Sequence, residues 1–597
     1  MNRGRGAGRG PAFAKPKEKT SVVLLKLWRY LARYQLIILA AAALSILGNA
    51  LGLLSPKLSG EAIKAIELES GVDFPIVIHY VLLMIAAAAL SSIISWALSA
   101  IMIRLSRNVV SKMRKDLFDH LTTLPISFFD QHQVGDVLSI LSYDVDTVGA
   151  TLSTDLTQII SSLVTVIGSF IMMVSIAPEL LLVFAVTIPL SIGITRWRAR
   201  IVRPLFSRRS RMLGALNGYC EEAVSGLKTI RAYHQEEEFN TRFDAHNEDA
   251  VQAAWKADHT AAVTGPTVNL INNLSLAAVS VFGALQYMAG RILLGDVSSF
   301  VLYSRKFSGP INEFANILAE IQSSLAAAER VLGLLALSPE PADDPDAQPI
   351  RDCHGRIEFR DVSFGYEPDK PVLHDVSFEV APGRVMAIVG ETGCGKTTLI
   401  NLLMRFYDVT EGAILLDGVD IRRLKRDELR RQFTMVLQDT WLFDGTVLEN
   451  IAYGRDGVSR EDVIAAAKAA HIHDMIQSLP QGYDTVVTGS GNSISKGQKQ
   501  LLTIARAMLI DSPMLILDEA TSNVDAQTER RIQDAMLRLM QGRTCFVIAH
   551  RLSTITGADC ILVMDKGRIV ESGTHQELLQ KKGMYHELYH AQFDRTD

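Results

Sequence analysis

Long apolar runs without a charged residue occupy the first half of the chain and restrict its fold more than any other feature. They lie at 34 to 56, 74 to 103, 156 to 178, 180 to 195 and 260 to 290. A helix that crosses a bilayer needs about 20 mainly apolar residues, so four runs are long enough alone, and the run from 180 needs its flanks. Each run is therefore a candidate membrane-spanning helix.

A sixth span is expected from 297 to 325. Its charged residues are Arg305, Lys306, Glu313 and Glu320. Hydropathy rates this span weak, but an odd number of spans would leave the N-terminus or the C-terminal half on the wrong side of the membrane. The charges indicate either a polar cavity wall, or an assignment error or side chains that reach the interface. Pro310 would kink the helix, and Asn269, Asn272 and Asn273 add polarity to the fifth span.

Basic residues set the expected orientation. Nine Lys/Arg precede the first span, five lie between Arg104 and Asp155, and eleven lie between Arg196 and Lys256, whereas the opposite loops contain three. The positive-inside rule makes the N-terminus and the two long loops cytoplasmic. Apolar residues recur at intervals of three and four residues in these loops, so the spans are expected to continue as helices into the cytosol.

Composition excludes some classes of protein. The chain is 48% hydrophobic and 21% charged, as expected for a membrane part joined to a soluble part. A net charge of −5 argues against a nucleic-acid partner. The five cysteines have no paired metal-ligand spacing, and their odd number fits poorly with a disulfide framework. Residues 1–20 are basic and rich in Gly and Pro, which predicts a disordered tail.

The second half of the chain has a different pattern. Segment 336–350 is acidic and Pro-rich without periodicity, and is expected to be a linker. From 351, short β-like runs alternate with helical stretches, which predicts an α/β domain with a mainly parallel sheet.

The strand VMAIVG runs directly into GETGCGKTT, which matches the phosphate-binding loop of nucleotide hydrolases. The predicted loop is Gly390, Glu391, Thr392, Gly393, Cys394, Gly395, Lys396, Thr397 and Thr398. The glycines allow backbone N–H groups to turn toward phosphate oxygens, Lys396 reaches the β and γ phosphates, and Thr397 ligates Mg²⁺. Cys394 lies among these groups, so we expect a reactive thiolate; the alternative is a small residue too buried to react.

Two more strands end in residues suited to hydrolysis. MLILDE ends in Asp518 and Glu519, where a metal ligand and a base that activates water are needed. His550 ends the strand TCFVIAH at the same predicted edge, and there a contact with the γ-phosphate is favoured over a packed or capping histidine.

Two further segments, VLQDTWLF with Gln438 and SISKGQKQLLTIARAML, lie between these motifs, and DEATSNVD follows them. With these motifs the chain resembles ATP-binding-cassette (ABC) transporters of the exporter type over about residues 20 to 595. The resemblance implies that Tyr366 stacks on adenine, that Gln438 joins Thr397 and Asp518 at the metal, and that Asp525 closes the dimer loop. The alternatives are a strand-end aromatic for Tyr366 and a solvated loop residue for Gln438.

The family pattern also implies an assembly. Two chains would enclose two ATP molecules, and the γ-phosphate bound by one chain would be gripped by Ser495, Lys496, Gly497 and Gln498 of the other. The expected organisation is a tail (1–20), an all-α six-helix transmembrane domain (21–335), a linker (336–350) and an α/β P-loop nucleotide-binding domain (351–597). Short helices near 125 to 135 and 218 to 226 would couple the domains.

The resemblance implies an ATPase that acts as a translocase in the cell (inner) membrane, with its nucleotide domain in the cytoplasm and with ATP and Mg²⁺ as cofactors. The expected activity is export of amphipathic small molecules, including drugs, or of lipids by alternating access, with membrane lipid around the spans. The alternatives are an exporter-fold importer of a metal chelate such as a siderophore, and an ATP-gated channel or regulatory ATPase.

The signature segment departs from the family pattern. Lys496 replaces the first of two usual glycines, and TVVTGSGNS before it lacks the usual acidic residue and glycine-rich turn. The phosphate loop, Glu519 and His550 keep the expected residues. This asymmetry favours a heterodimer in which the present chain supplies the one fast site, and a homodimer with two modest sites is the alternative.

Overall fold

The computed structural model describes residues 20–66, 72–438, 440–455, 457–488, 494–518, 525–548 and 555–593, with side chains for all of them except 20, 311–316, 318, 526, 592 and 593. The chain forms two compact units, one of residues 1–122 with 132–337 and the other of residues 123–131 with 338–597. The predicted basic tail falls almost entirely outside the described residues, because the first helix begins at Thr20.

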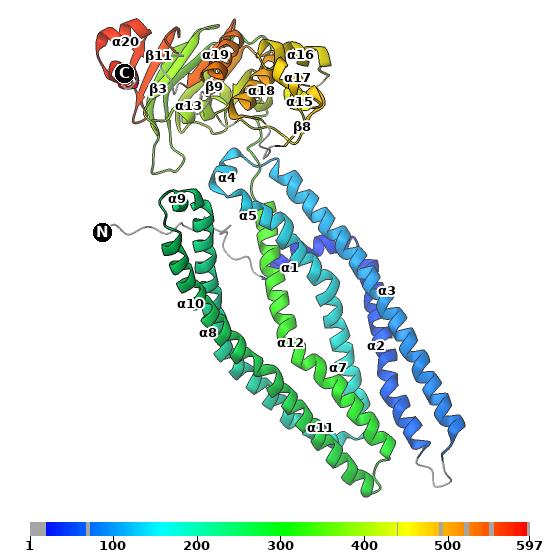
Figure 1. Ribbon diagram of the computed structural model, residues 1–597. Helices are drawn as coiled ribbons and strands as arrows, with labels where there is room; N and C mark the ends of the chain where they lie inside the picture. Colours follow the sequence, from blue (N-terminus) through cyan, green and yellow to red (C-terminus); the bar gives the residue numbers. More distant parts are fainter. Residues whose placement is uncertain are drawn as a thin grey trace. The chain divides into compact units, whose positions relative to one another are not determined.

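The first unit consists of helices and connecting turns wherever it is described (Figure 1). Its α-helices are α1 (Thr20–Ala32), α2 (Gln35–Lys64), α3 (Phe74–Leu121), α5 (Val134–Ser139), α6 (Val145–Ala150), α7 (Leu156–Ile176), α8 (Leu182–Ser225), α9 (Leu227–Ala232), α10 (Glu236–Ala262), α11 (Thr264–Met288) and α12 (Leu294–Leu335). Two π-helical segments, Ile140–Asp144 and Thr151–Asp155, join α5, α6 and α7 into one long rod, and the 3₁₀ turn Pro178–Leu181 connects α7 to α8.

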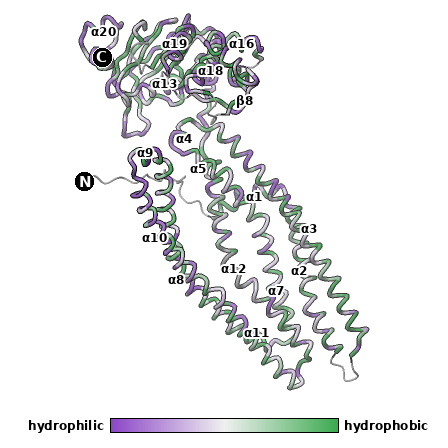
Figure 2. Tube along the Cα trace, viewed as in Figure 1, coloured by the Kyte–Doolittle hydropathy of each residue, from purple (hydrophilic) through white to green (hydrophobic). Residues whose placement is uncertain are grey.

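Long apolar stretches fill this unit. Five of those described are long and apolar enough to cross a membrane: Gln35–Lys64, Phe74–Leu121, Val134–Ile176, Pro178–Ser225 and Glu236–Met288. As the sequence predicts, hydropathy does not select the sixth, yet α12 is a helix of 42 residues that continues through Pro310. Figure 2 shows hydrophobic residues along α2, α3 and α11, and more hydrophilic ones on α9 and α10.

The helices extend well beyond the thickness of a bilayer. With a rise of 1.5 Å per residue, the 48 residues of α3 span about 72 Å, whereas the hydrocarbon core is about 30 Å thick. The polar segment around Lys112 and Asp116 belongs to the same helix as the apolar start at Phe74. The expectation that the spans continue as helices is confirmed.

A proline in α2 explains one of the charges in the sixth span. Pro56 has no N–H, so the carbonyl of Gly52, four residues earlier, loses its helical partner. The Nζ of Lys306 in α12 donates to this carbonyl at 3.0 Å, and the Tyr303 hydroxyl donates to the neighbouring Leu53 carbonyl at 2.6 Å. Because lipid offers no hydrogen bonds, Lys306 satisfies a backbone carbonyl that the membrane would leave unpaired.

Three sheets are formed by the described residues of the second unit. Its strands are β1 (Ile357–Phe364), β2 (Leu373–Val380), β3 (Val385–Gly390), β4 (Glu411–Leu416), β5 (Val419–Asp420), β6 (Phe433–Val436), β7 (Gly445–Thr446), β8 (Val486–Val487), β9 (Met514–Asp518), β10 (Thr544–Ile548), β11 (Cys560–Asp565) and β12 (Arg568–Gly573). The large sheet has the order β12-β11-β3-β10-β9-β6, and all of its neighbouring pairs are parallel except β11 with β12. The predicted mainly parallel sheet is confirmed.

Ten α-helices of this unit are described, and several of them pack against the large sheet. The ten are α4 (Ile126–Gln131), α13 (Lys396–Leu403), α14 (Arg426–Arg431), α15 (Val447–Ala452), α16 (Arg460–Ala469), α17 (His473–Ser478), α18 (Lys496–Leu509), α19 (Ala526–Met540), α20 (His575–Lys581) and α21 (Met584–Phe593). Successive residues of β3 enter different cores: Ala387 and Val389 pack with α18 and α19, while Met386 and Ile388 pack with α13 and the antiparallel sheet β2-β1-β4-β5. The sheet is therefore buried on both faces.

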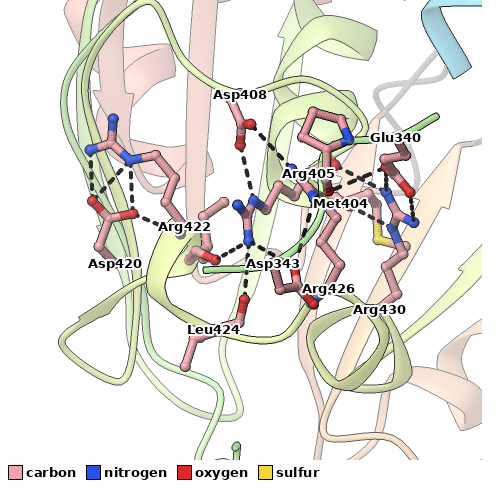
Figure 3. A network of polar contacts seen from close by, with 12 residues as sticks. Glu340, Asp343, Met404, Arg405, Asp408, Asp420, Arg422, Leu424, Arg426 and Arg430 are labelled. Atoms are coloured by element: carbon pink, nitrogen blue, oxygen red, sulfur yellow. Dashed lines mark hydrogen bonds and ion pairs between the residues drawn. The ribbon is translucent and has the colours of Figure 1, made fainter. Parts of the chain in front are cut away.

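The segment expected to be a linker is fixed to the second unit by ion pairs (Figure 3). Glu340 accepts from Arg430 at 2.5 Å, and Asp343 lies 3.7 Å from both Arg405 and Arg426. Both of these arginines are buried, with 6% of each residue exposed. Their charges require partners inside the protein, and Asp408, at 3.0 and 3.3 Å, provides them together with the acidic residues of 338–350.

Candidate functional site

The predicted motifs follow parallel strands that end at one edge of the large sheet. The strands end at Gly390 (β3), Val436 (β6), Asp518 (β9) and Ile548 (β10). Their register places Ile548 opposite both Ile388 and Asp518. Open α/β sheets bind ligands outside the carboxyl ends of their strands, so this edge is the candidate nucleotide site.

The two predicted catalytic residues follow this edge directly in sequence. Glu519 comes after the last residue of β9, and His550 comes two residues after β10. Both lie outside the described residues. Their proposed roles therefore stay predictions, supported by the ends of the strands that lead to them.

The phosphate loop has the backbone that its glycines predict. Gly393 and Gly395 have φ of +89° and +105°, and a Cβ on Gly395 would lie 2.6 Å from a Leu373 methyl group. Gly395 immediately precedes α13, so the loop ends at the N-terminus of a helix, where backbone N–H groups attract anions. The Lys396 Nζ donates to the carbonyls of Gly390 and Glu391 at 2.7 and 2.8 Å, which places the ammonium group across the loop.

Cys394 differs from the accessible thiol that the sequence suggested. Only 4% of the residue is exposed, and it packs in the apolar core with Leu399 and Met564. Its sulfur lies 3.7 Å from the Lys396 Nζ. The cationic neighbour is present, but the structure favours the alternative in which Cys394 is a small residue that fits the loop and is shielded from reagents.

Oxygen ligands for Mg²⁺ are available around the loop. Thr397 is exposed on the first turn of α13, Gln438 is exposed after β6, and Asp518 ends β9. In the described part of the chain, three or more His, Cys, Asp or Glu side chains nowhere gather into a metal cluster. A hydroxyl, an amide and one carboxylate fit Mg²⁺, which is usually held by few protein ligands and by substrate phosphates.

Tyr366 lies next to the phosphate loop. Its hydroxyl donates to Thr398 Oγ1 at 3.2 Å and accepts from Asn401 Nδ2 at 3.1 Å, so α13 holds the ring from one side. The residue is 42% exposed, which leaves ring surface for an adenine. This exposure favours the stacking role over a strand-end aromatic that only covers the core.

The signature segment forms the start of α18. Ser495 is the N-cap: its Oγ accepts from the Gln498 N–H at 3.3 Å, while Gln498 Oε1 accepts from the Ser495 N–H at 2.9 Å. Gly497 is buried, whereas Lys496 is exposed at the first helical position. Within one chain, therefore, Lys496 has room to extend into solvent without crowding the helix end.

Asp525 is likewise an N-cap, at the start of α19. Its carboxylate accepts from the Thr528 N–H at 2.9 Å. This backbone hydrogen bond is the main cause that lowers the pKa of Asp525, so the group is held as an anion at the beginning of the helix.

One contact that links distant parts of the second unit had no signal in the amino-acid sequence. The hydroxyl of Tyr407 bonds to Asp130 of α4 at 2.5 Å, and its ring meets the Tyr366 ring edge-on with centroids 5.0 Å apart. Burial, and then the bond to Asp130, raise the pKa of Tyr407. One side chain thus contacts both the candidate adenine residue and the α4 segment, which the family resemblance identifies as a coupling helix.

The first unit contains a polar pocket with a volume of about 420 Å³, which lies between α2, α3 and the long rod that ends in α7. Its polar lining residues are Ser45, Asn49, Ser91, Ser95, Ser99, Ser153, Thr154, Thr157, Gln158 and Ser161. Asn49 Oδ1 accepts from Ser161 at 2.8 Å and from Thr165 at 3.3 Å. The wall is rich in hydroxyl and amide groups and contains no ionisable side chain.

The asparagines singled out in the sequence lie elsewhere. Asn269 and Asn273 are exposed on α11, and Asn272 is half-buried there. They do not line this pocket. The pocket forms only when serines and threonines from separate helical segments come together in the fold. Because hydroxyl residues are common in membrane spans, the sequence has no local signal for it.

Comparison with known proteins identifies the family. The model of the ABC transporter transmembrane region matches residues 38–311, and a second family model, described as ABC transporter, matches residues 373–522. The ABC transporter YfiC of Bacillus subtilis, itself uncharacterized, is 42% identical over 584 residues, which cover 98% of this chain and 96% of YfiC. The chain belongs to the ABC transporter family.

Other relatives of the transporter agree. A fatty acid ABC transporter ATP-binding/permease protein of Mycobacterium tuberculosis is 43% identical, covering 87% of this chain and 82% of the relative. An ATP-dependent lipid A-core flippase of Syntrophus aciditrophicus is 37% identical, covering 82% and 81%. A bacterial Atm1-family ABC exporter solved with ATP bound superposes with a TM-score of 0.76 at 31% identity, covering 94% of this chain and 98% of that one. The transporter therefore has the exporter fold and hydrolyses ATP.

Proposed function

We propose that the transporter exports an amphipathic lipid whose head group is neutral and forms hydrogen bonds. The hydroxyl- and amide-lined pocket carries this proposal. Polar groups inside a membrane protein are costly unless they are paired, and this pocket offers several beside apolar helices that face lipid. A head group with hydroxyl, ester or amide atoms would bond to the wall, while its acyl chain stayed among apolar side chains.

The named relatives support a lipid over a drug. One is called a fatty acid transporter and another a lipid A-core flippase, and both cover more than four fifths of this chain. The ionisable residues that a carboxylate or phosphate would require are not among those lining the pocket. The acyl part of the proposed substrate therefore rests on the relatives, and its neutral head group rests on the residues that line the pocket.

Hydrolysis in this proposal uses the edge of the large sheet. Lys396 and the N–H groups before α13 hold the phosphates, Thr397, Gln438 and Asp518 hold Mg²⁺, and Glu519 activates water. His550 contacts the γ-phosphate. The nucleotide unit lies in the cytoplasm, since the basic residues of the first half flank the same ends of the spans.

We also propose that the working assembly is a heterodimer. Lys496 is exposed at the helix end that would face the partner's ATP, where glycine permits the closest approach of backbone N–H groups. This chain then supplies the phosphate loop, Glu519 and His550 of the fast site, and its partner supplies a glycine-type signature. Purification of this chain alone tests the proposal: robust substrate-stimulated ATPase, unchanged by Lys496→Gly, would contradict it.

The substrate proposal is tested by stimulation of ATPase activity in reconstituted transporter. Asn49→Leu removes the acceptor of two hydrogen bonds in the pocket and should abolish stimulation by acyl lipids with neutral head groups. Asn269→Leu makes the same chemical change on α11, outside the pocket, and should retain stimulation. If Asn269→Leu alone loses stimulation, the substrate pathway follows α11 and the pocket proposal is wrong.

Transport direction needs a separate measurement in vesicles. In vesicles whose second unit faces the external solution, addition of ATP should move a fluorescent acyl lipid from the outer to the inner leaflet. Movement in the opposite sense would show import and favour the importer alternative.

A further inference from the structure

A second pocket lies at the end of α12 from which the chain continues into the second unit. It has a volume of about 500 Å³ and is enclosed by α1, α3 and α12. Its lining residues are Lys26, Arg29, Tyr30, Arg33, Tyr34, Val109, Lys112, Leu332, Leu335 and Ala336. This wall has four cationic side chains and no acidic one, and it shares no residue with the hydroxyl-lined pocket.

The helix that forms one wall has two distinct faces. Lys26, Arg29, Tyr30 and Arg33 recur at intervals of three and four, so they share the face toward the pocket. Leu24, Leu25 and Trp28, on the adjoining surface, are 52%, 62% and 50% exposed. At 13 residues, α1 is about 20 Å long and too short to cross a bilayer.

The position of α1 fits the membrane surface. Two residues separate it from α2, the first membrane span, and it runs across the direction of the long helices (Figure 1). A short helix with a basic face and an exposed apolar face lies in the interface, with its apolar side chains among the acyl chains. The mouth of the basic pocket is then at the level of the lipid head groups.

Two arginines of the pocket, Arg29 and Arg33, are available to bind a ligand. Lys112 pairs with Asp116 at 2.6 Å, and Asp116 also bonds to Tyr30. Among the described residues, neither Arg29 nor Arg33 has an ion-pair partner. Arginine binds phosphate oxygens through two parallel N–H groups, so these two side chains are suited to a phosphate.

We propose that this pocket binds the phosphate head group of an anionic phospholipid from the adjacent leaflet. Arg29 and Arg33 hold the phosphate, and Val109, Leu332 and Leu335 form an apolar floor for the glycerol and the first acyl carbons. The exposed leucines of α1 extend that apolar surface into the membrane. The lipid here is a bound structural ligand and not the transported substrate, so the site stands independently of the substrate proposed above.

The experiment is a titration of the full-length transporter in neutral detergent with phosphatidylglycerol, followed by native mass spectrometry, with phosphatidylcholine as the neutral-lipid comparison. Wild type should prefer phosphatidylglycerol. In Arg29→Gln/Arg33→Gln its affinity should fall about 30-fold, about fivefold for each arginine near a membrane surface. Arg29→Lys/Arg33→Lys keeps the charge and should retain most of the binding, which separates a lipid site from a purely structural role.

The matched control is Arg208→Gln/Arg211→Gln. Both arginines are exposed on α8 and form no ion pair among the described residues, so the net charge changes equally. This variant should bind phosphatidylglycerol like wild type. Equal binding by the Arg29/Arg33 glutamine variant and the control would overturn the site. Displacement of the lipid by millimolar inorganic phosphate would also overturn it, because the pocket would then bind a free anion.

Discussion

The two side chains of the ion pair between Asp144 and Arg330 differ in burial, and this difference leads to a prediction. Asp144 ends the π-helical segment Ile140–Asp144, and Arg330 lies near the end of α12. Each carboxylate oxygen accepts one bond, Oδ2 from Nε at 2.7 Å and Oδ1 from Nη2 at 2.5 Å. The Asp144 side chain is 3% exposed, whereas the Arg330 side chain is 47% exposed.

Removal of Arg330 and removal of Asp144 should therefore lower the free energy of unfolding by different amounts. Arg330→Ala leaves a buried carboxylate without its two donors, which costs about 3–5 kcal/mol of unfolding free energy. Asp144→Asn leaves a guanidinium that water can solvate, so its cost is that of lost hydrogen bonds to a charged group, about 1–3 kcal/mol. We expect Arg330→Ala to be the more destabilising change by about 2 kcal/mol.

The assay is unfolding of the purified transporter in mixed micelles by a titration with sodium dodecyl sulfate, followed by tryptophan fluorescence. Arg114→Ala is the matched control, because its partner Asp146 lies at 2.6 Å in the same region but the two side chains are 43% and 63% exposed. This exposed pair should contribute at most about 1 kcal/mol. Equal costs for Arg330→Ala and Arg114→Ala, or a larger cost for Asp144→Asn, would refute the reasoning.

Three further predictions concern the second unit. Lys396→Ala should weaken ATP binding by at least tenfold in a fluorescent-nucleotide titration, because the loop loses its ammonium group; unchanged affinity would contradict the assignment. Cys394 should react with maleimide much more slowly than the half-buried Cys220 in the native protein, and rapid labelling that ATP prevents would restore the reactive-thiol hypothesis. Tyr407→Phe removes the bond to Asp130 while keeping the ring against Tyr366, so basal ATPase should persist while stimulation by substrate falls several-fold; full stimulation would show that the hydroxyl plays no part in coupling.

The sequence predicted the features that are encoded locally. Charge-free runs reveal spans because the bilayer excludes charged side chains over a fixed thickness. The phosphate loop is recognisable because eight successive residues, from Gly390 to Thr397, form the whole motif. The mainly parallel sheet also follows from the alternation of β-like and helical runs, and so does the carboxyl edge to which Asp518 belongs.

Contacts between distant residues were not predictable in this way. Tyr407 and Asp130 are separated by 277 positions, and Asp144 and Arg330 by 186. The role of Lys306 requires the register of α12 against α2, since only then does its ammonium group reach the carbonyl that Pro56 leaves unpaired. The segment 338–350 has no periodicity of its own, and it is ordered by arginines that come more than 60 residues later.

The most direct test of the account is ATP-driven lipid movement by the transporter in proteoliposomes. A fluorescent acyl lipid with a neutral head group is placed in the membrane, and its leaflet is determined by quenching from outside. Wild-type transporter with its partner should move the lipid only when ATP and Mg²⁺ are supplied. Glu519→Gln should bind ATP but move no lipid, because water loses its base. Equal movement without ATP, or in Glu519→Gln, would contradict the central claim.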